Sequence, residues 1–280
     1  MNDRLNGCHV RPRHGNGVRS LLIAAAFGWA AQEAQGQSPF ASMMELATAS
    51  SVIEVDTVAG KTRVLLASGE DAPRVLVVFA PGGQGGVDFS ADAAGRPVSA
   101  RPRNPAFMFA PEFLKRRAAW AILAVPESFG AEISETQRLD GKHIEAVAQV
   151  AQRLRAAHPT ARLVLIGHSN GGITAAMQAI QTKPAFDAIV LSAPNLRWLP
   201  FRWQAQTRVP VLFITHKSDE CPSTAAWKTV SAAGDRHPVV VIERPSPGPR
   251  AECFATPAPH FFSDAYGEYA EAILRWAATL

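Results

Sequence analysis

The sequence lacks the features that mark several functional classes. After residue 40, no apolar stretch approaches the roughly 18–20 uncharged residues that a membrane helix needs. It has no H-x-x-x-H or C-x-x-C pair with metal-ligand spacing. Its glycine-rich segment 82–86 matches neither the phosphate-binding G-x-x-x-x-G-K-[ST] pattern nor the dinucleotide-binding G-x-G-x-x-G pattern. We therefore expect no integral membrane segment in the mature chain, no metal and no cofactor.

The chain also has little excess charge of either sign. Its 280 residues include 28 Lys and Arg against 24 Asp and Glu, which gives a net charge of +4. Half of that excess lies in residues 1–36, which carry four arginines and two acidic residues. Without this segment the positive charge is too small to favour a nucleic-acid partner.

The first 36 residues have the pattern of an export signal. A basic stretch ending at Arg19 precedes an apolar run over 21–31, which is too short to span a bilayer. The small residues Ala34 and Gly36 stand where a signal peptidase would require them. The pattern predicts a signal peptide over 1–36, a linker over 37–50 and an exported (periplasmic or secreted) protein. An ordinary buried helix, or a shorter signal behind a misassigned start codon, is the alternative.

Cysteine is scarce, with three residues at positions 8, 221 and 253. Removal of the signal would discard Cys8 and leave an even pair. In an oxidising compartment we expect Cys221 and Cys253 to form a disulfide. Two unrelated buried thiols are the alternative.

Strand and helix patterns alternate over residues 51–280. Segments 51–58 and 61–67 indicate an antiparallel hairpin, and β-branched runs indicate buried strands at 74–80, 121–125, 161–167, 188–191, 209–214 and 239–242. Apolar residues recur at helical spacing over 144–154, 173–180 and 266–280. Residues 87–109 are expected to form a long loop and 111–119 a short helix. These patterns predict one α/β domain with a mostly parallel sheet and helices on both faces.

A G-x-S-x-G motif, Gly167-His-Ser-Asn-Gly171, stands between a predicted strand and a predicted helix. This is the context of a nucleophile elbow, a strained turn that exposes the serine hydroxyl at the top of the sheet. Glycines are needed because a side chain two residues either way would collide with neighbouring backbone. The motif predicts Ser169 as a nucleophile. A tight turn with an inert serine is the alternative.

With these elements, residues 50–280 resemble the α/β-hydrolase superfamily, whose catalytic residues follow the chain order Ser, acid, His. The resemblance implies that Asp219, after the strand over 209–214, is the acid, with its neighbour Glu220 as a rival. It implies that His260, before the C-terminal helix, is the base, with His216 as the alternative.

The resemblance also implies an oxyanion hole. The backbone N–H of Asn170 would supply one donor, and the loop after the strand over 74–80 would supply the other from Gly83 or Gln84.

Only residues 195–208 separate two of the strands, so we expect no large cap domain. If the two cysteines are bridged, the bridge would join the loop of the acid to the loop of the base.

Three aromatic residues, Trp198, Phe201 and Trp203, stand where the superfamily often lines an acyl or alcohol pocket. Membership of the core is the alternative for them. The sequence thus predicts an exported serine hydrolase that acts on a small-molecule ester. A peptidase or an acyltransferase with the same three residues, or a non-catalytic binding protein on the same fold, remains open.

Overall fold

The computed structural model of the chain describes residues 37–200, 202–221, 237–245, 257–263 and 265–280. The chain divides at Gly36, and the unit Gln37–Leu280 contains every element named below. The predicted signal peptide with its Cys8, and also Phe201 and Cys253, lie outside the described residues.

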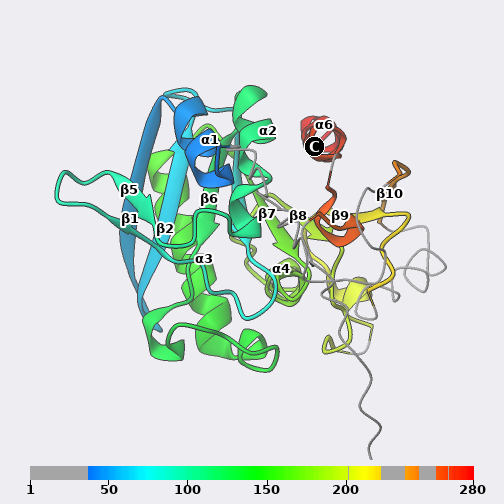
Figure 1. The fold of residues 1–280 in the computed structure, drawn as a ribbon. Helices are drawn as coiled ribbons and strands as arrows, with labels where there is room; N and C mark the ends of the chain where they lie inside the picture. Colours follow the sequence, from blue (N-terminus) through cyan, green and yellow to red (C-terminus); the bar gives the residue numbers. More distant parts are fainter. Residues whose placement is uncertain (1–36, 201, 222–236, 246–256, 264) are drawn as a thin grey trace, which may run out of the picture. The chain divides into compact units, whose positions relative to one another are not determined.

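An eight-stranded sheet organises the described residues (Figure 1). Its strands, in spatial order, are β1 (Ala49–Thr57), β2 (Gly60–Ser68), β6 (Ala119–Leu123), β3 (Val75–Ala80), β7 (Arg162–His168), β8 (Ala188–Ser192), β9 (Val211–His216) and β10 (Val239–Ile242). The pairs β1–β2 and β2–β6 are antiparallel, and every later pair is parallel. The predicted α/β fold class, with its N-terminal antiparallel hairpin, is confirmed.

Helices cover both faces of this sheet. They are α1 (Pro39–Leu46), α2 (Ala110–Lys115), α3 (Gly141–Ala157), α4 (Gly171–Ala179) and α6 (Tyr266–Ala278), with short 3₁₀ turns η1 (Pro105–Phe107), η2 (Glu127–Phe129), η3 (Gln137–Leu139), η4 (Trp203–Gln206) and η5 (Pro259–Phe261). Figure 1 shows α1, α2 and α6 on one side of the sheet and α3 and α4 on the other. None of the helices in the described part of the chain has the length and apolar character to cross a membrane.

The alternation of side chains along the strands produces two separate cores. In β3, Val77 and Phe79 pack in the core under α1, α2 and α6, while Leu76 and Val78 pack in the core under α3 and α4. Successive residues of a strand point to opposite faces, so a strand covered on both sides is apolar throughout. This explains why the central strands have continuous apolar sequences.

Residues 37–50 are not the linker that the sequence predicts. They contain α1 and the beginning of β1. The Ser38 hydroxyl accepts a hydrogen bond from the Ala41 N–H at 3.2 Å and caps the helix, which begins at Pro39. Met43 is fully buried in the core. The folded unit therefore begins about 14 residues earlier than predicted, at Gln37.

The segment 87–109 is also more ordered than the predicted loop. It contains the hairpin strands β4 (Phe89–Ala91) and β5 (Pro97–Ser99), followed by η1. The Asp92 carboxylate closes this hairpin by accepting hydrogen bonds from the N–H groups of Ala94 and Arg96, both at 2.9 Å. A local side-chain interaction of this kind substitutes for an alternating apolar pattern. The helix predicted over 111–119 ends at Lys115 because β6 already begins at Ala119.

Removal of a buried side chain from the central strands should destabilise the fold strongly. Leu165 of β7 is fully buried in the core under α3 and α4. We expect Leu165→Ala to lower the free energy of unfolding by about 2–5 kcal/mol, because it loses apolar burial and leaves a cavity. Leu280, which is 43% exposed, provides a matched control. Leu280→Ala should change the free energy of unfolding by no more than about 0.5 kcal/mol. Urea unfolding measures both, and equal losses would contradict the assignment of this core.

Candidate active site

Ser169 lies in a turn between the end of β7 and the start of α4. Its backbone has φ of 53°, in the left-handed region that a residue with a side chain seldom adopts. Such strain persists only where the surrounding structure enforces it. The Ser169 N–H donates to Ser192 O at 2.9 Å, and Ser169 O accepts from the N–H groups of Gly172 and Asn195, also at 2.9 Å. The predicted turn at Ser169 is therefore present, and hydrogen bonds of both the N–H and the C=O of Ser169 hold it in place.

The glycines around Ser169 are required by space. A Cβ on Gly167 would lie 2.3 Å from Gly171 O, and a Cβ on Gly171 would lie 2.0 Å from Ala80 O at the end of β3. Both distances are far below any real contact of a Cβ atom. The predicted reason for the two glycines, collision with neighbouring backbone, agrees with these contacts.

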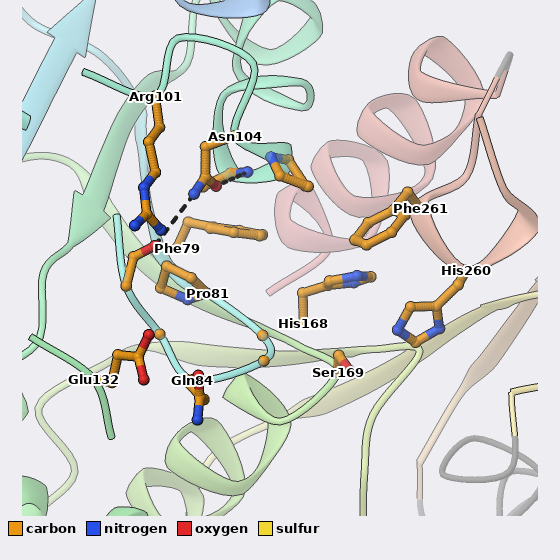
Figure 2. A pocket seen from close by; sticks show the side chains of 16 residues that line it. Phe79, Pro81, Gln84, Arg101, Asn104, Glu132, His168, Ser169, His260 and Phe261 are labelled. Carbon is orange, nitrogen blue, oxygen red and sulfur yellow. Dashed lines mark hydrogen bonds between the residues drawn. The ribbon is translucent and has the colours of Figure 1, made fainter. Parts of the chain in front are cut away.

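His260 and Asp219 form a buried pair. The imidazole Nδ1 lies 3.0 Å from Asp219 Oδ2, and both side chains are almost completely inaccessible to solvent. The other carboxylate oxygen, Oδ1, accepts the Cys221 N–H at 3.0 Å. With Nδ1 engaged by the carboxylate, Nε2 is the ring nitrogen that can accept a proton. His260 and Ser169 line the same cavity, and Figure 2 shows them next to each other.

The rival residues lie elsewhere. Glu220 is exposed. His216 is buried, its Nδ1 accepts the Ser218 N–H at 3.1 Å, and it is not among the residues that line the cavity with Ser169. Burial lowers the pKa of His216, which favours a neutral ring. The geometry thus unites Ser169 with His260 and Asp219.

The glycine-rich loop after β3 approaches Ser169 closely. A Cβ on Gly82 would lie 2.8 Å from Ser169 Cβ. The Gly85 N–H donates to Gly82 O at 3.0 Å and closes the turn, in which Gly83 has φ of +54°. Within the described residues, the N–H groups of Asn170, Gly83 and Gln84 donate to no acceptor.

A cavity of about 260 Å³ opens beside these groups. Apolar walls come from Phe79, Pro105 and Phe261. Figure 2 shows Ser169 and His260 at one end of this cavity and Arg101 and Glu132 at the other. The cavity therefore has a serine hydroxyl and an imidazole at one end and charged side chains of both signs at the other.

The comparisons with known proteins agree with this geometry. Residues 136–245 match the family model described as serine aminopeptidase, S33. An α/β serine hydrolase without a lid from Xanthomonas campestris superposes with a TM-score of 0.55 at 18% identity, over 82% of this chain and 95% of that one. Dienelactone hydrolase from Anabaena variabilis gives a TM-score of 0.56 at 15% identity, over 81% and 97%.

An acylaminoacyl peptidase from Pyrococcus horikoshii gives a TM-score of 0.55 at 12% identity, over 80% of this chain but only 41% of that one. A search of curated protein sequences finds no match. Strand order, elbow and structural neighbours together decide the class. The chain has the α/β-hydrolase fold. The matches support an enzyme of the hydrolase class, and a dienelactone hydrolase and a peptidase both occur among them.

The aromatic residues predicted to line the pocket do not lie at the cavity beside Ser169. Trp203 is buried in the core and packs against Phe213, with ring centroids 6.2 Å apart. Trp198 is 44% exposed, and neither tryptophan lines the cavity at Ser169. The pocket walls come instead from β3, the loop after it and η1, segments that sequence reasoning treated as core or loop.

Two functional positions were missed by the sequence analysis. His168 packs on the base His260, with ring centroids 4.9 Å apart, and its Nδ1 lies 3.1 Å from Ser192 Oγ. Complete burial lowers the pKa of His168 far below the usual histidine range, so a neutral ring packs against His260. The second position is Arg138 in η3, a buried arginine next to the glycine-rich loop. His168 stands at a position of the G-x-S-x-G motif that the motif leaves unspecified, and no local motif marks Arg138.

One cluster of three potential metal ligands occurs among the described residues. Asp219, Cys221 and His260 offer atoms within 4.8 Å of one another. The carboxylate and the imidazole of this cluster are already hydrogen-bonded to each other. The arrangement therefore corresponds to an acid and base pair more closely than to a ligand set.

The approach of Gly82 to Ser169 generates a prediction. In Gly82→Ala the new methyl would meet both Ser169 Cβ and, at 2.9 Å, His168 O, so the loop must move away. We expect a loss of about 1–3 kcal/mol in unfolding free energy and a slower reaction of Ser169 with a fluorophosphonate. A Cβ on Gly141 would have no neighbour within 4 Å. Gly141→Ala is thus the matched control and should leave both quantities nearly unchanged. Wild-type reactivity in Gly82→Ala would show that the loop does not need this close approach.

Proposed function

We propose that this α/β-hydrolase is a serine hydrolase that cleaves carboxylic esters of small molecules through Ser169, His260 and Asp219. The observation that carries the proposal is the meeting of two independent features in one cavity. A serine on a strained turn and a buried imidazole with its own carboxylate line the same space. A structural serine would require neither the strain nor the adjacent pair.

The geometry supports acyl transfer in two stages. His260 Nε2 takes the proton of Ser169 Oγ, and the oxygen attacks the ester carbonyl carbon to form a tetrahedral oxyanion. The imidazolium then returns the proton to the leaving alkoxide as the C–O bond breaks, which gives an acyl-serine and an alcohol. Water then attacks the acyl-serine while the same imidazole takes its proton. The imidazolium returns this proton to Ser169 Oγ as the acyl C–O bond breaks, which releases the acid and restores the Ser169 hydroxyl. Asp219 stabilises the imidazolium at each stage through the hydrogen bond at 3.0 Å.

The oxyanion is stabilised by backbone donors of fixed orientation. The N–H of Asn170 supplies the first, at the start of α4, where the helix dipole also favours negative charge. Gly83 or Gln84 supplies the second. One such donor contributes about 3–4 kcal/mol to transition-state stabilisation in other hydrolases. Because the donors belong to rigid turns, little reorganisation accompanies the reaction.

Peptide hydrolysis is the second candidate, and the family match over 136–245 is the observation that favours it. The same three residues can cleave an amide, so the mechanism does not separate the two. The size and lining of the cavity favour a small substrate with both apolar and polar parts. Activity on a small ester but not on an aminoacyl anilide would support the first candidate.

The nucleophile is tested by covalent labelling. A fluorophosphonate should modify Ser169, and Ser169→Ala should abolish labelling and lower kcat by at least about 10⁴-fold. Ser90→Ala removes an exposed hydroxyl on β4 and is the control. The assay should use a panel of p-nitrophenyl esters beside aminoacyl anilides. Labelling that persists in Ser169→Ala would reject the proposal. Turnover of anilides alone would replace the esterase assignment with a peptidase.

We further propose that the protein is exported and that Cys221 is bridged to Cys253. The basic and apolar pattern over 1–36 and the even cysteine pair left after cleavage support this. Such a bridge would close a loop of about 32 residues and contribute roughly 3–4 kcal/mol in the chain-entropy model. Protein recovered from the exporting cell should begin at Gln37 and contain no thiol that reacts with an alkylating agent under denaturing conditions. A chain that keeps residues 1–36, or two alkylated cysteines, would refute the respective part.

A further inference from the structure

Two backbone carbonyls of the glycine-rich loop after β3, residues 81–86, accept hydrogen bonds from a buried arginine. We propose that Arg138 is a positioning residue that fixes this loop against Ser169 for oxyanion binding. The catalytic part of this inference rests on the proposed hydrolase function, while the structural part does not.

The contacts of Arg138 all lead to the loop or to the elbow helix. Its Nη2 donates to Pro81 O at 3.0 Å and to Gly83 O at 3.3 Å, and its Nη1 donates to Thr174 Oγ1 of α4 at 3.1 Å. The residue is 2% exposed. One guanidinium therefore joins two carbonyls of the loop to the helix that follows Ser169. The planar fork of an arginine can do this, whereas a lysine ammonium is a single point of attachment.

A second side chain reaches the same loop carbonyl from the elbow. Asn170, the residue after the nucleophile, donates through Nδ2 to Gly83 O at 3.2 Å and to Glu135 Oε1 at 3.0 Å. Its Oδ1 accepts from Asn195 Nδ2 at 2.8 Å. Gly83 O thus receives donors from two directions. The loop is tied both to η3 and to the residue whose own N–H faces the oxyanion.

These carbonyl contacts also fix the direction of the loop amides. In a planar trans peptide, the C=O and the N–H of the same unit point in opposite directions. Engagement of Gly83 O by Arg138 and Asn170 therefore directs the Gln84 N–H away from both. The Gly85 N–H engages Gly82 O and in the same way orients the Gly83 N–H. Loss of Arg138 would free Pro81 O and remove one of the two restraints on Gly83 O.

The electrostatic cost of this arrangement argues against a purely structural role. Among the described residues, no carboxylate oxygen lies within salt-bridge distance of Arg138, and Glu135 is the acidic neighbour that favours its charge. Burial lowers the pKa of Arg138 to about 10, so the group still carries its charge at neutral pH. An apolar side chain would satisfy a core position without this desolvation cost. Only the backbone carbonyls of the loop and Thr174 require such a donor.

The test compares Arg138→Gln and Arg138→Lys with a matched control. Arg155 also joins a backbone carbonyl, donating from Nη2 to Ala185 O at 3.1 Å and to Asp187 at 3.0 Å, but it does so away from the site. Arg155→Gln therefore removes an arginine-to-carbonyl link outside the site, from a side chain that is 39% exposed. For each purified variant, hydrogen exchange of the Gly85 amide, whose hydrogen bond to Gly82 O closes the loop, is measured together with steady-state kinetics on a p-nitrophenyl ester.

We expect Arg138→Gln to accelerate exchange of the Gly85 amide, which donates to Gly82 O and so reports on the closed turn, at least about 10-fold. We also expect it to lower kcat about 100-fold, with KM within about threefold of wild type. Arg138→Lys should recover part of both losses, and Arg155→Gln should change neither. If Arg138→Gln does not fold, Arg138→Lys alone must still show both effects in reduced form.

Unchanged exchange in the loop of the Arg138 variants would overturn the proposal whatever the activity. Faster exchange with kcat within about threefold of wild type would overturn its catalytic part. If wild type itself hydrolyses no substrate and is not labelled, while exchange still rises in the Arg138 variants, the proposed hydrolase function fails and the positioning role stands.

Discussion

Close packing of backbone at the ends of β3 and β7 is the constraint on which the site depends. Gly171 and Gly82 have no room for a Cβ because Ala80 O, Ser169 Cβ and His168 O occupy that space. This packing brings the oxyanion loop and the nucleophile turn together. The interior of a protein is too dense for such a contact to relax around an added atom. The strained backbone of Ser169, the available amides and the shape of the cavity all follow from it.

Asp219 and His260, the proposed acid and base, come from chain segments that follow β9 and β10, whereas Ser169 follows β7. Asp219 follows β9 and His260 lies in η5, and both enter the site at the carboxyl ends of parallel strands. This is the edge where open α/β sheets bind ligands. The base is held by a carboxylate on one side and by the neutral ring of His168 on the other. The order of the parallel strands therefore brings together groups that are far apart in the sequence.

Sequence reasoning located the parts of the site that depend on local pattern or chain order. The elbow is written into five consecutive residues between a strand and a helix, and the positions of Asp219 and His260 follow from strand order once the superfamily resemblance is stated. The pocket walls could not be found this way, because the sequence around an aromatic residue such as Trp203 does not show whether it packs in the core or lines a pocket. Arg138 was also missed. Its role depends on backbone carbonyls more than 50 residues away, which no local spacing records. The helix α1 was missed because it has only eight residues, about two turns, which are too few to show a clear apolar periodicity.

The left-handed backbone of Ser169 has a consequence for how this protein can evolve or be engineered. A residue with a side chain costs about 1–2 kcal/mol in that conformation, and glycine would remove the cost together with the hydroxyl. Ser169 is one of five non-glycine residues with positive φ in the described part of the chain, and it is the one that the proposed chemistry requires. Selection for thermal stability alone therefore acts against the nucleophile, and a library screened without an activity assay would enrich inactive clones. Stability and turnover are opposing objectives at this single residue.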